Sequence, residues 1–124
     1  MNVNKSIFRA YDIRGVYPDE INEETAYAIG KAYAALLAGE HPGEKLTVAV
    51  GRDMRLSSPA MQEQLIEGLL ESGINVDNLG LVSTPTFYFG VAFFGYAGGL
   101  QVSASHNPKE WNGVKMTRAK GLSL

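Results

Sequence analysis

Apolar side chains between Asn22 and Gly39 recur at every third or fourth position, a spacing that predicts an amphipathic helix. Asn22 is the expected N-cap, because its side-chain oxygen can accept a hydrogen bond from a backbone N–H of the first turn. The two glutamates that follow it suit the positive end of the helix dipole. Gly39 and the sequence His41-Pro42-Gly43 are expected to end this helix.

Two strand–loop–helix units follow. The first combines a β-branched run at residues 46–50, typical of a strand covered on both faces, with a helix whose expected N-cap is Ser58. The second combines a strand at residues 75–82 with a mostly buried helix at residues 86–96.

Further strands are predicted at residues 100–103 and 114–117, with a polar loop at residues 104–113 between them. Residues 8–18 are expected to form a short extended segment that ends in a turn. The alternation of strands and helices predicts an α/β layered domain, and the pattern supplies four strands for its sheet.

The composition is that of one globular domain and excludes several kinds of site. The chain has 124 residues, of which 45% are hydrophobic and 19% are charged. It contains no cysteine, which excludes disulfides, thiol nucleophiles and Cys-ligated metals. The net charge is -2 and no basic run occurs, so a non-specific nucleic-acid binder is disfavoured. The first residues do not resemble a secretory signal, and we expect a cytoplasmic location.

One uncharged stretch, from Asn78 to Pro108, raises the question of a membrane span. Thr84-Pro85 and several glycines interrupt it, and its unbroken runs are shorter than the roughly 18 apolar residues that a spanning helix needs. We therefore interpret it as buried strand and helix, and expect no membrane partner.

The loop after residues 100–103 concentrates side chains that can carry chemistry: Ser103, Ser105, His106, Asn107 and Lys109. A solvent-exposed turn would use the same residue types. A serine hydrolase is disfavoured because the G-x-S-x-G motif is absent, and a nucleotide-binding loop because neither glycine-rich fingerprint occurs. The third functional interpretation is a serine that carries a phosphoryl group among donors and cations.

Three motifs together resemble the α-D-phosphohexomutase family. They are FRAYDIRG near the start, GRDMRLSSP in the middle, and SASHNP followed by NGVK. The form of the first motif favours the bacterial phosphomannomutase/phosphoglucomutase branch. The resemblance implies domain I of a four-domain enzyme over residues 1–124, apparently truncated at its C-terminus. The implied fold is a three-layer αβα domain with a four-stranded mixed sheet.

The resemblance also assigns roles to residues that match the family motifs. Ser105 would be the phosphoserine, which exchanges its phosphoryl group as hexose 6-phosphate and hexose 1-phosphate interconvert through glucose or mannose 1,6-bisphosphate. Arg14, Lys115 and His106 would be catalytic, and Tyr11, Arg14 and Lys115 would bind substrate. In the full-length parent, Mg²⁺ would bind through the phosphate on Ser105. The family's aspartate ligands for the metal, a D-G-D-x-D cluster, do not occur in this chain.

The implied partners are the hexose phosphate substrate and the remaining domains of the parent enzyme. The isolated chain is therefore expected to be inactive. Four aromatic residues of the uncharged stretch are expected to support self-association: Phe87, Phe89, Phe93 and Phe94.

Arg52 and Asp53 are expected to form an ionic network within their own turn. Two alternative functions stay open: a non-catalytic binding module that keeps the fold, and a phosphoglucosamine mutase-like domain.

Overall fold

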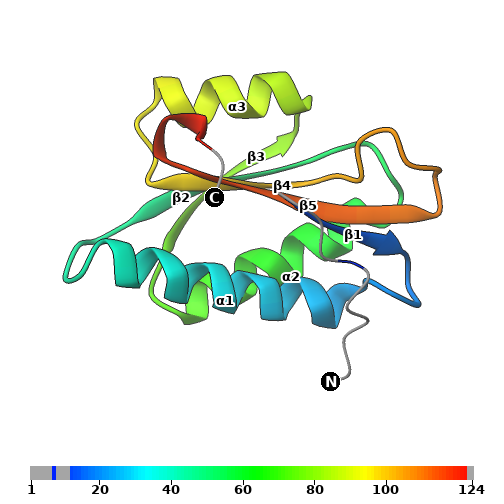
Figure 1. Ribbon diagram of the computed structural model, residues 1–124, viewed down its shortest axis with the longest axis horizontal. Helices are drawn as coiled ribbons and strands as arrows, with labels where there is room; N and C mark the ends of the chain where they lie inside the picture. The colour runs from blue at the N-terminus through cyan, green and yellow to red at the C-terminus, as the bar shows by residue number, and fades with distance from the viewer. Residues whose placement is uncertain (1–6, 8–11, 123–124) are drawn as a thin grey trace.

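Helices cover both faces of a mixed β-sheet, with α1 and α2 on one face and α3 on the other (Figure 1). The computed structural model describes residue 7 and residues 12–122. Its elements are β1 (Asp12–Val16), α1 (Glu23–Glu40), β2 (Thr47–Arg52), α2 (Ser58–Glu71), β3 (Asn75–Leu81), α3 (Thr84–Phe93), β4 (Gly98–Val102), β5 (Trp111–Arg118) and the short 3-10 helix η2 (Ala119–Gly121). The predicted three-layer αβα fold is confirmed.

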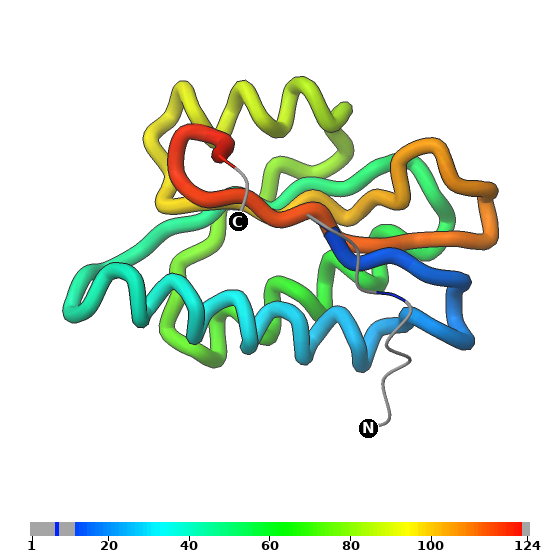
Figure 2. Tube along the Cα trace, in the orientation of Figure 1, coloured from blue at the N-terminus to red at the C-terminus, as the bar shows by residue number. Residues whose placement is uncertain are grey.

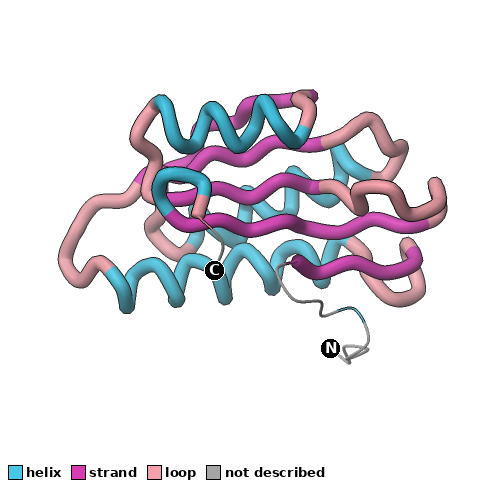
Figure 3. Tube along the Cα trace, turned by 45° about the horizontal axis from the view of Figure 1, so that its top comes forward, coloured by secondary structure: helices cyan, strands magenta, loops and turns pink. Residues whose placement is uncertain are grey.

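The sheet has five strands within the described residues, in the order β1-β5-β4-β2-β3, and they lie side by side in Figure 3. β2 is parallel to β3 and β4, whereas β5 is antiparallel to β4 and β1. The prediction of four strands is wrong, because the extended segment near the start joins the sheet as β1. Its partner strand lies about a hundred residues away in sequence, which no local pattern reveals.

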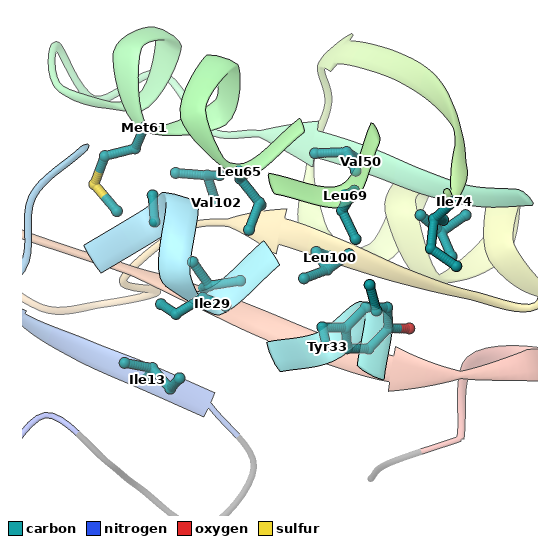
Figure 4. Packing of buried hydrophobic residues seen from close by; sticks show 14 of the residues in the cluster. Ile13, Ile29, Tyr33, Val50, Met61, Leu65, Leu69, Ile74, Leu100 and Val102 are labelled. Carbon is teal, nitrogen blue, oxygen red and sulfur yellow. The ribbon is translucent and has the colours of Figure 1, made fainter. Parts of the chain in front are cut away.

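The main core lies between the sheet and the helix pair α1 and α2. Figure 4 shows Ile29 and Tyr33 of α1 close to side chains of α2 and of the central strands. Leu65, Leu100 and Val102 in this cluster are fully buried. In β2, β4 and β5 the residues with even numbers face this core, and those with odd numbers therefore face α3. In β1 the order is reversed, because Ile13 belongs to the core.

α1 and α2 cross at two glycines that allow their backbones to touch. A side chain at Gly30 would collide with the carbonyl oxygen of Leu65 and lie 3.2 Å from the backbone nitrogen of Leu69. A side chain at Gly68 would meet the backbone of Tyr27 in the same way. The spacing of the helical layer thus depends on the absence of two Cβ atoms.

The opposite face is covered by α3 alone. Phe87 and Val91 are buried against Gly99 of β4, where a Cβ would lie 2.6 Å from Val91 Cγ2. Phe89 and Phe93 are 61% and 68% exposed, so the prediction of a mostly buried helix is wrong. One narrow side of α3 is buried against the sheet, and its outer side carries exposed aromatic residues.

The predicted element boundaries need small corrections. Asn22 is the N-cap of α1, as predicted, and its Oδ1 accepts from the Thr25 N–H at 3.0 Å. The N-cap of α2 is Ser57, one residue before the predicted Ser58. α1 continues through Gly39 to Glu40. Along the described part of the chain, we find no helix with the length and apolar character needed to cross a bilayer.

The glycine contact predicts opposite effects for the same substitution at two positions of α1. Gly30→Ala should lower the free energy of unfolding by about 1–3 kcal/mol, because α2 must shift. Gly39→Ala should raise it by about 0.5–1 kcal/mol, because a Cβ there meets nothing within 4 Å and alanine favours helix. Urea unfolding of both variants measures the difference. Equal effects would contradict the proposed backbone contact.

Candidate functional site

The site begins where β2 and β4 end. These strands are parallel, so their carboxyl ends leave the sheet at the same edge, which is where ligands bind in open α/β sheets. Figure 2 shows the green segment after β2 beside the orange segment after β4 at one end of the molecule. The Asp53 N–H donates to the Val102 carbonyl at 2.9 Å and joins the two loop origins.

A cleft of about 1090 Å³ lies between these loops, the start of α3 and strand β5. Its lining includes three of the predicted site residues: Ser105, His106 and Lys115. Arg14, on β1, does not line it and is linked to it through Asp12, which also contacts Lys115. Tyr11 lies outside the described residues, so its predicted role stays a prediction.

Ser105 is half-buried in the loop that follows β4 and has a φ of 56°, in the left-handed region. Its N–H donates to Ser103 Oγ at 3.0 Å. The next turn is closed by Asn107, whose N–H and Nδ2 donate to the Ala104 carbonyl at 3.1 and 2.8 Å. The hydroxyl at position 103 is thus a structural acceptor, a task that threonine performs equally well.

Two cations and one buried carboxylate form a row across β1 and β5. The antiparallel register pairs Asp12 with Lys115, and Lys115 Nζ lies 3.0 Å from Asp12 Oδ2. Arg14 Nε lies 3.4 Å from Asp12 Oδ1. Asp12 is 8% exposed. One carboxylate therefore holds both predicted catalytic cations in place and leaves the row with one net positive charge.

Sequence reasoning missed Asp12 as a site residue. The available signal was the D-x-R alternation of β1, which places both side chains on one face of a strand. The identity of their partner, Lys115, depends on pairing across 103 positions of sequence.

The ionic pair predicted between Arg52 and Asp53 is wrong. Arg52 Nη1 instead donates to Gln62 Oε1 at 3.2 Å, and Asp53 pairs with Arg55, whose Nε lies 3.1 Å from Asp53 Oδ2. Successive residues of an extended strand end point to opposite sides, which separates Arg52 from Asp53. Arg55 was also missed, although it lines the cleft.

Other groups at the cleft favour an anionic ligand with an apolar part. The N-termini of α2 and α3 contribute Ser57 and Thr84 to its lining, and helix N-termini carry partial positive charge. Met54 and Leu56 extend into solvent at 87% and 102% exposure.

Tyr17 also lines the cleft. Its hydroxyl donates to Glu23, and this hydrogen bond raises the pKa of the Tyr17 hydroxyl.

The described residues do not form a metal site by themselves. No group of three or more His, Cys, Asp or Glu side chains lies close enough together in this part of the chain. Hard cations such as Mg²⁺ require several oxygen ligands. A phosphate on Ser105 would supply one of them at most from this domain, so the fit is incomplete.

The class that fold and site define is an αβα domain with a serine loop at the carboxyl edge of its sheet, beside paired cations. The sequence profile described as "Phosphoglucomutase/phosphomannomutase, alpha/beta/alpha domain I" matches residues 5–124. The chain belongs to this family, which confirms the resemblance found in its motifs.

Named relatives agree with this assignment. The chain is 45% identical over 111 residues to a phosphomannomutase of Vibrio cholerae, with 90% of this chain and 24% of that protein covered. It is 48% identical over 115 residues to a phosphomannomutase/phosphoglucomutase of Pseudomonas syringae, with 92% and 24% covered. The chain thus spans about a quarter of the length of these relatives.

Solved structures show the same fold. A phosphoglucomutase/phosphomannomutase family protein of Burkholderia thailandensis superposes with a TM-score of 0.88 at 33% identity, over 99% of this chain and 28% of that one. A putative phosphomannomutase of Thermus thermophilus gives 0.86 at 32% identity, over 94% and 26%.

The charge row predicts how the cleft responds when its carboxylate is neutralised. Asp12→Asn should strengthen the binding of inorganic phosphate by roughly fivefold, because Arg14 and Lys115 lose their anionic partner. Asp77→Asn is the matched control, since Asp77 is exposed on the far edge strand and bonded to Tyr96. Titration followed by the backbone amide signals of residues 103–110 gives both affinities. Equal strengthening in the two variants would indicate net charge alone and contradict the local effect.

Proposed function

We propose that this chain is the phosphoserine-bearing first domain of a phosphomannomutase/phosphoglucomutase, an intramolecular phosphotransferase that interconverts hexose 6-phosphate and hexose 1-phosphate. The observation that carries the proposal is Ser105, which lines the cleft together with Lys115 in a chain of this family. A serine hydroxyl forms a phosphate ester that is stable in water until an acceptor is positioned.

The reaction proceeds in two phosphoryl transfers. In the first, the bond between Ser105 Oγ and phosphorus breaks while a substrate hydroxyl bonds to phosphorus, and the hydroxyl proton passes to Ser105 Oγ, which gives a hexose 1,6-bisphosphate and an unmodified serine. In the second, the other phosphoryl group leaves its sugar oxygen and bonds to Ser105 Oγ, and the serine proton passes to that sugar oxygen. Lys115 and Arg14 stabilise the charge on the travelling group, and His106 lies next to the serine along the chain.

The rest of the parent enzyme completes this chemistry. The four-fold greater length of the relatives leaves room for domains that recognise the sugar and supply the remaining Mg²⁺ ligands. Mg²⁺ bound to the Ser105 phosphate would neutralise charge on the transferred group. Glucose or mannose 1,6-bisphosphate would act as intermediate and activator. A cytoplasmic setting for the parent stays a prediction.

Removal of the Ser105 hydroxyl tests the proposal directly. Ser105→Ala in the full-length parent should lower mutase activity by at least about a thousandfold, because a covalent carrier is lost. Ser103→Thr is the matched control and should retain near-normal activity, since its hydroxyl still accepts the Ser105 N–H. The assay uses glucose 1-phosphate with its bisphosphate activator. Near-normal turnover by Ser105→Ala would overturn the phosphoserine role.

The isolated chain should show no mutase activity above blank in a coupled assay with Mg²⁺, because catalysis needs a positioned sugar and a complete metal site. Intact-mass analysis of the same sample should show a fraction with one added phosphate on Ser105. Robust Mg²⁺-dependent turnover by the 124-residue chain would contradict the proposal that other parts of the parent enzyme are needed for activity. A sample without phosphate, even after incubation with hexose bisphosphate, would favour a non-catalytic module.

A further inference from the structure

Arg55 makes an unusually complete set of hydrogen bonds to the loop that carries Ser105. Its Nη2 donates to the carbonyls of Ser105 and Asn107 at 3.0 and 2.9 Å. Its Nη1 donates to the carbonyls of Pro108 and Trp111 at 2.6 and 3.0 Å. Its Nε donates to Asp53 Oδ2 at 3.1 Å. A guanidinium has five N–H donors, and this arrangement uses all of them.

Because every N–H donor of the Arg55 guanidinium is already used, its role follows from the partners that it has. Although Arg55 is a cation that lines the cleft, no N–H donor is left for a phosphate oxygen of a ligand. Its side chain is only 12% exposed. Arg55 is therefore not a substrate-binding arginine, and its interactions serve the serine loop.

The loop needs such support because Ser105 adopts a conformation that serine avoids. A φ of 56° brings the Cβ of an L-residue close to its own backbone and is tolerated only where the surroundings impose it. Both peptide groups that flank Ser105 are held. Its N–H donates to Ser103 Oγ, and its carbonyl accepts from Arg55 Nη2, each at 3.0 Å.

The direction of the Ser105 carbonyl has a second effect. In a trans peptide unit the C=O and the following N–H point in opposite directions. Because the Ser105 carbonyl faces Arg55, the His106 N–H faces away from it. Among the described residues, no backbone acceptor for this N–H is found.

Arg55 is itself anchored to the core through Asp53. Asp53 Oδ1 accepts from the Arg55 N–H at 3.1 Å and from Ser58 Oγ at 2.6 Å. Ser58 Oγ accepts in turn from Asn112 Nδ2 at 3.0 Å, and Ser58 and Asn112 are fully buried. The start of α2, strand β5 and the serine loop thus share one network.

We propose that Arg55 is a positioning residue, which holds Ser105 in its left-handed conformation and orients the serine loop toward the cleft. The consequence for phosphoryl transfer rests on the proposed function. The effect on the conformation of Ser105 does not, and it can be measured in the unmodified chain.

The conformational part is tested by a double-mutant cycle on the 124-residue chain. Arg55→Lys keeps the charge but cannot reach four carbonyls, and we expect it to lower the melting temperature by several degrees. In a Ser105→Gly background the same substitution should cost less than half as much, because glycine adopts a positive φ without strain. Arg118→Lys, at the exposed pair with Glu40, is the matched control and should give equal shifts in both backgrounds.

Hydrogen exchange provides a second measurement on the same variants. Exchange of the Ser105 and Asn107 amides should accelerate at least tenfold in Arg55→Lys and stay unchanged in Arg118→Lys. If Arg55→Lys does not fold, Asp53→Asn removes the anchor and takes its place in the cycle. Additive melting shifts, or unchanged exchange in the loop, would overturn the proposal.

The functional part is tested in the full-length parent. Arg55→Lys should lower kcat at least tenfold with KM for the hexose phosphate within about twofold, because Arg55 has no donor left for the substrate. A raised KM with unchanged kcat would show that Arg55 binds substrate and would overturn the proposal. An inactive wild-type parent would count against the proposed function alone. The double-mutant cycle of melting temperatures tests the positioning role of Arg55 independently of activity.

Discussion

The parallel pairing of β2 and β4 is the constraint on which the rest of this domain depends. Both strands are buried in the middle of the sheet and end at the same edge, with Arg52 opposite Val102. A parallel pair requires helical crossovers, and α2 and α3 provide them on opposite faces. The loops that follow the two strands are therefore neighbours in space. The contact between Arg55 and the serine loop exists only because of this geometry.

A second strand pairing supplies the charge of the site. β5 returns antiparallel to β4 and brings Lys115 to the face on which α3 lies, beside Asp12 of the edge strand β1. Because α3 covers only part of this face, Lys115 of the row remains at the cleft. The buried carboxylate lowers the cost of holding two cations side by side before an anion arrives. The helix α3, which forms this layer alone, also leaves Phe89 and Phe93 exposed.

Local sequence signals predicted the parts of this structure that depend on neighbours along the chain. Asn22 and the apolar spacing after it predicted α1, and the serine, histidine and lysine that line the cleft were found from motifs. The missed features, by contrast, are long-range. The pairing of Asp12 with Lys115 spans 103 positions, and the bonds of Arg55 to the loop span 50 to 56. Exposure of α3 depends on what packs beside it, which periodicity does not encode.

The cations near Ser105 differ in how many of their N–H donors already have acceptors, and this difference separates their roles. All five donors of Arg55 are used by carbonyls and by Asp53, so its charge stabilises loop backbone. Lys115, in contrast, shares Asp12 with Arg14, and Arg14 Nε is buried with no hydrogen-bond partner of good geometry among the described residues. Their row holds one carboxylate for two cations. A dianionic phosphate would complete this row, whereas it would find nothing to bind at Arg55. Positive charge is therefore divided between a rigid support for the serine loop and an under-compensated pair, which under the proposed function would stabilise the transferred group.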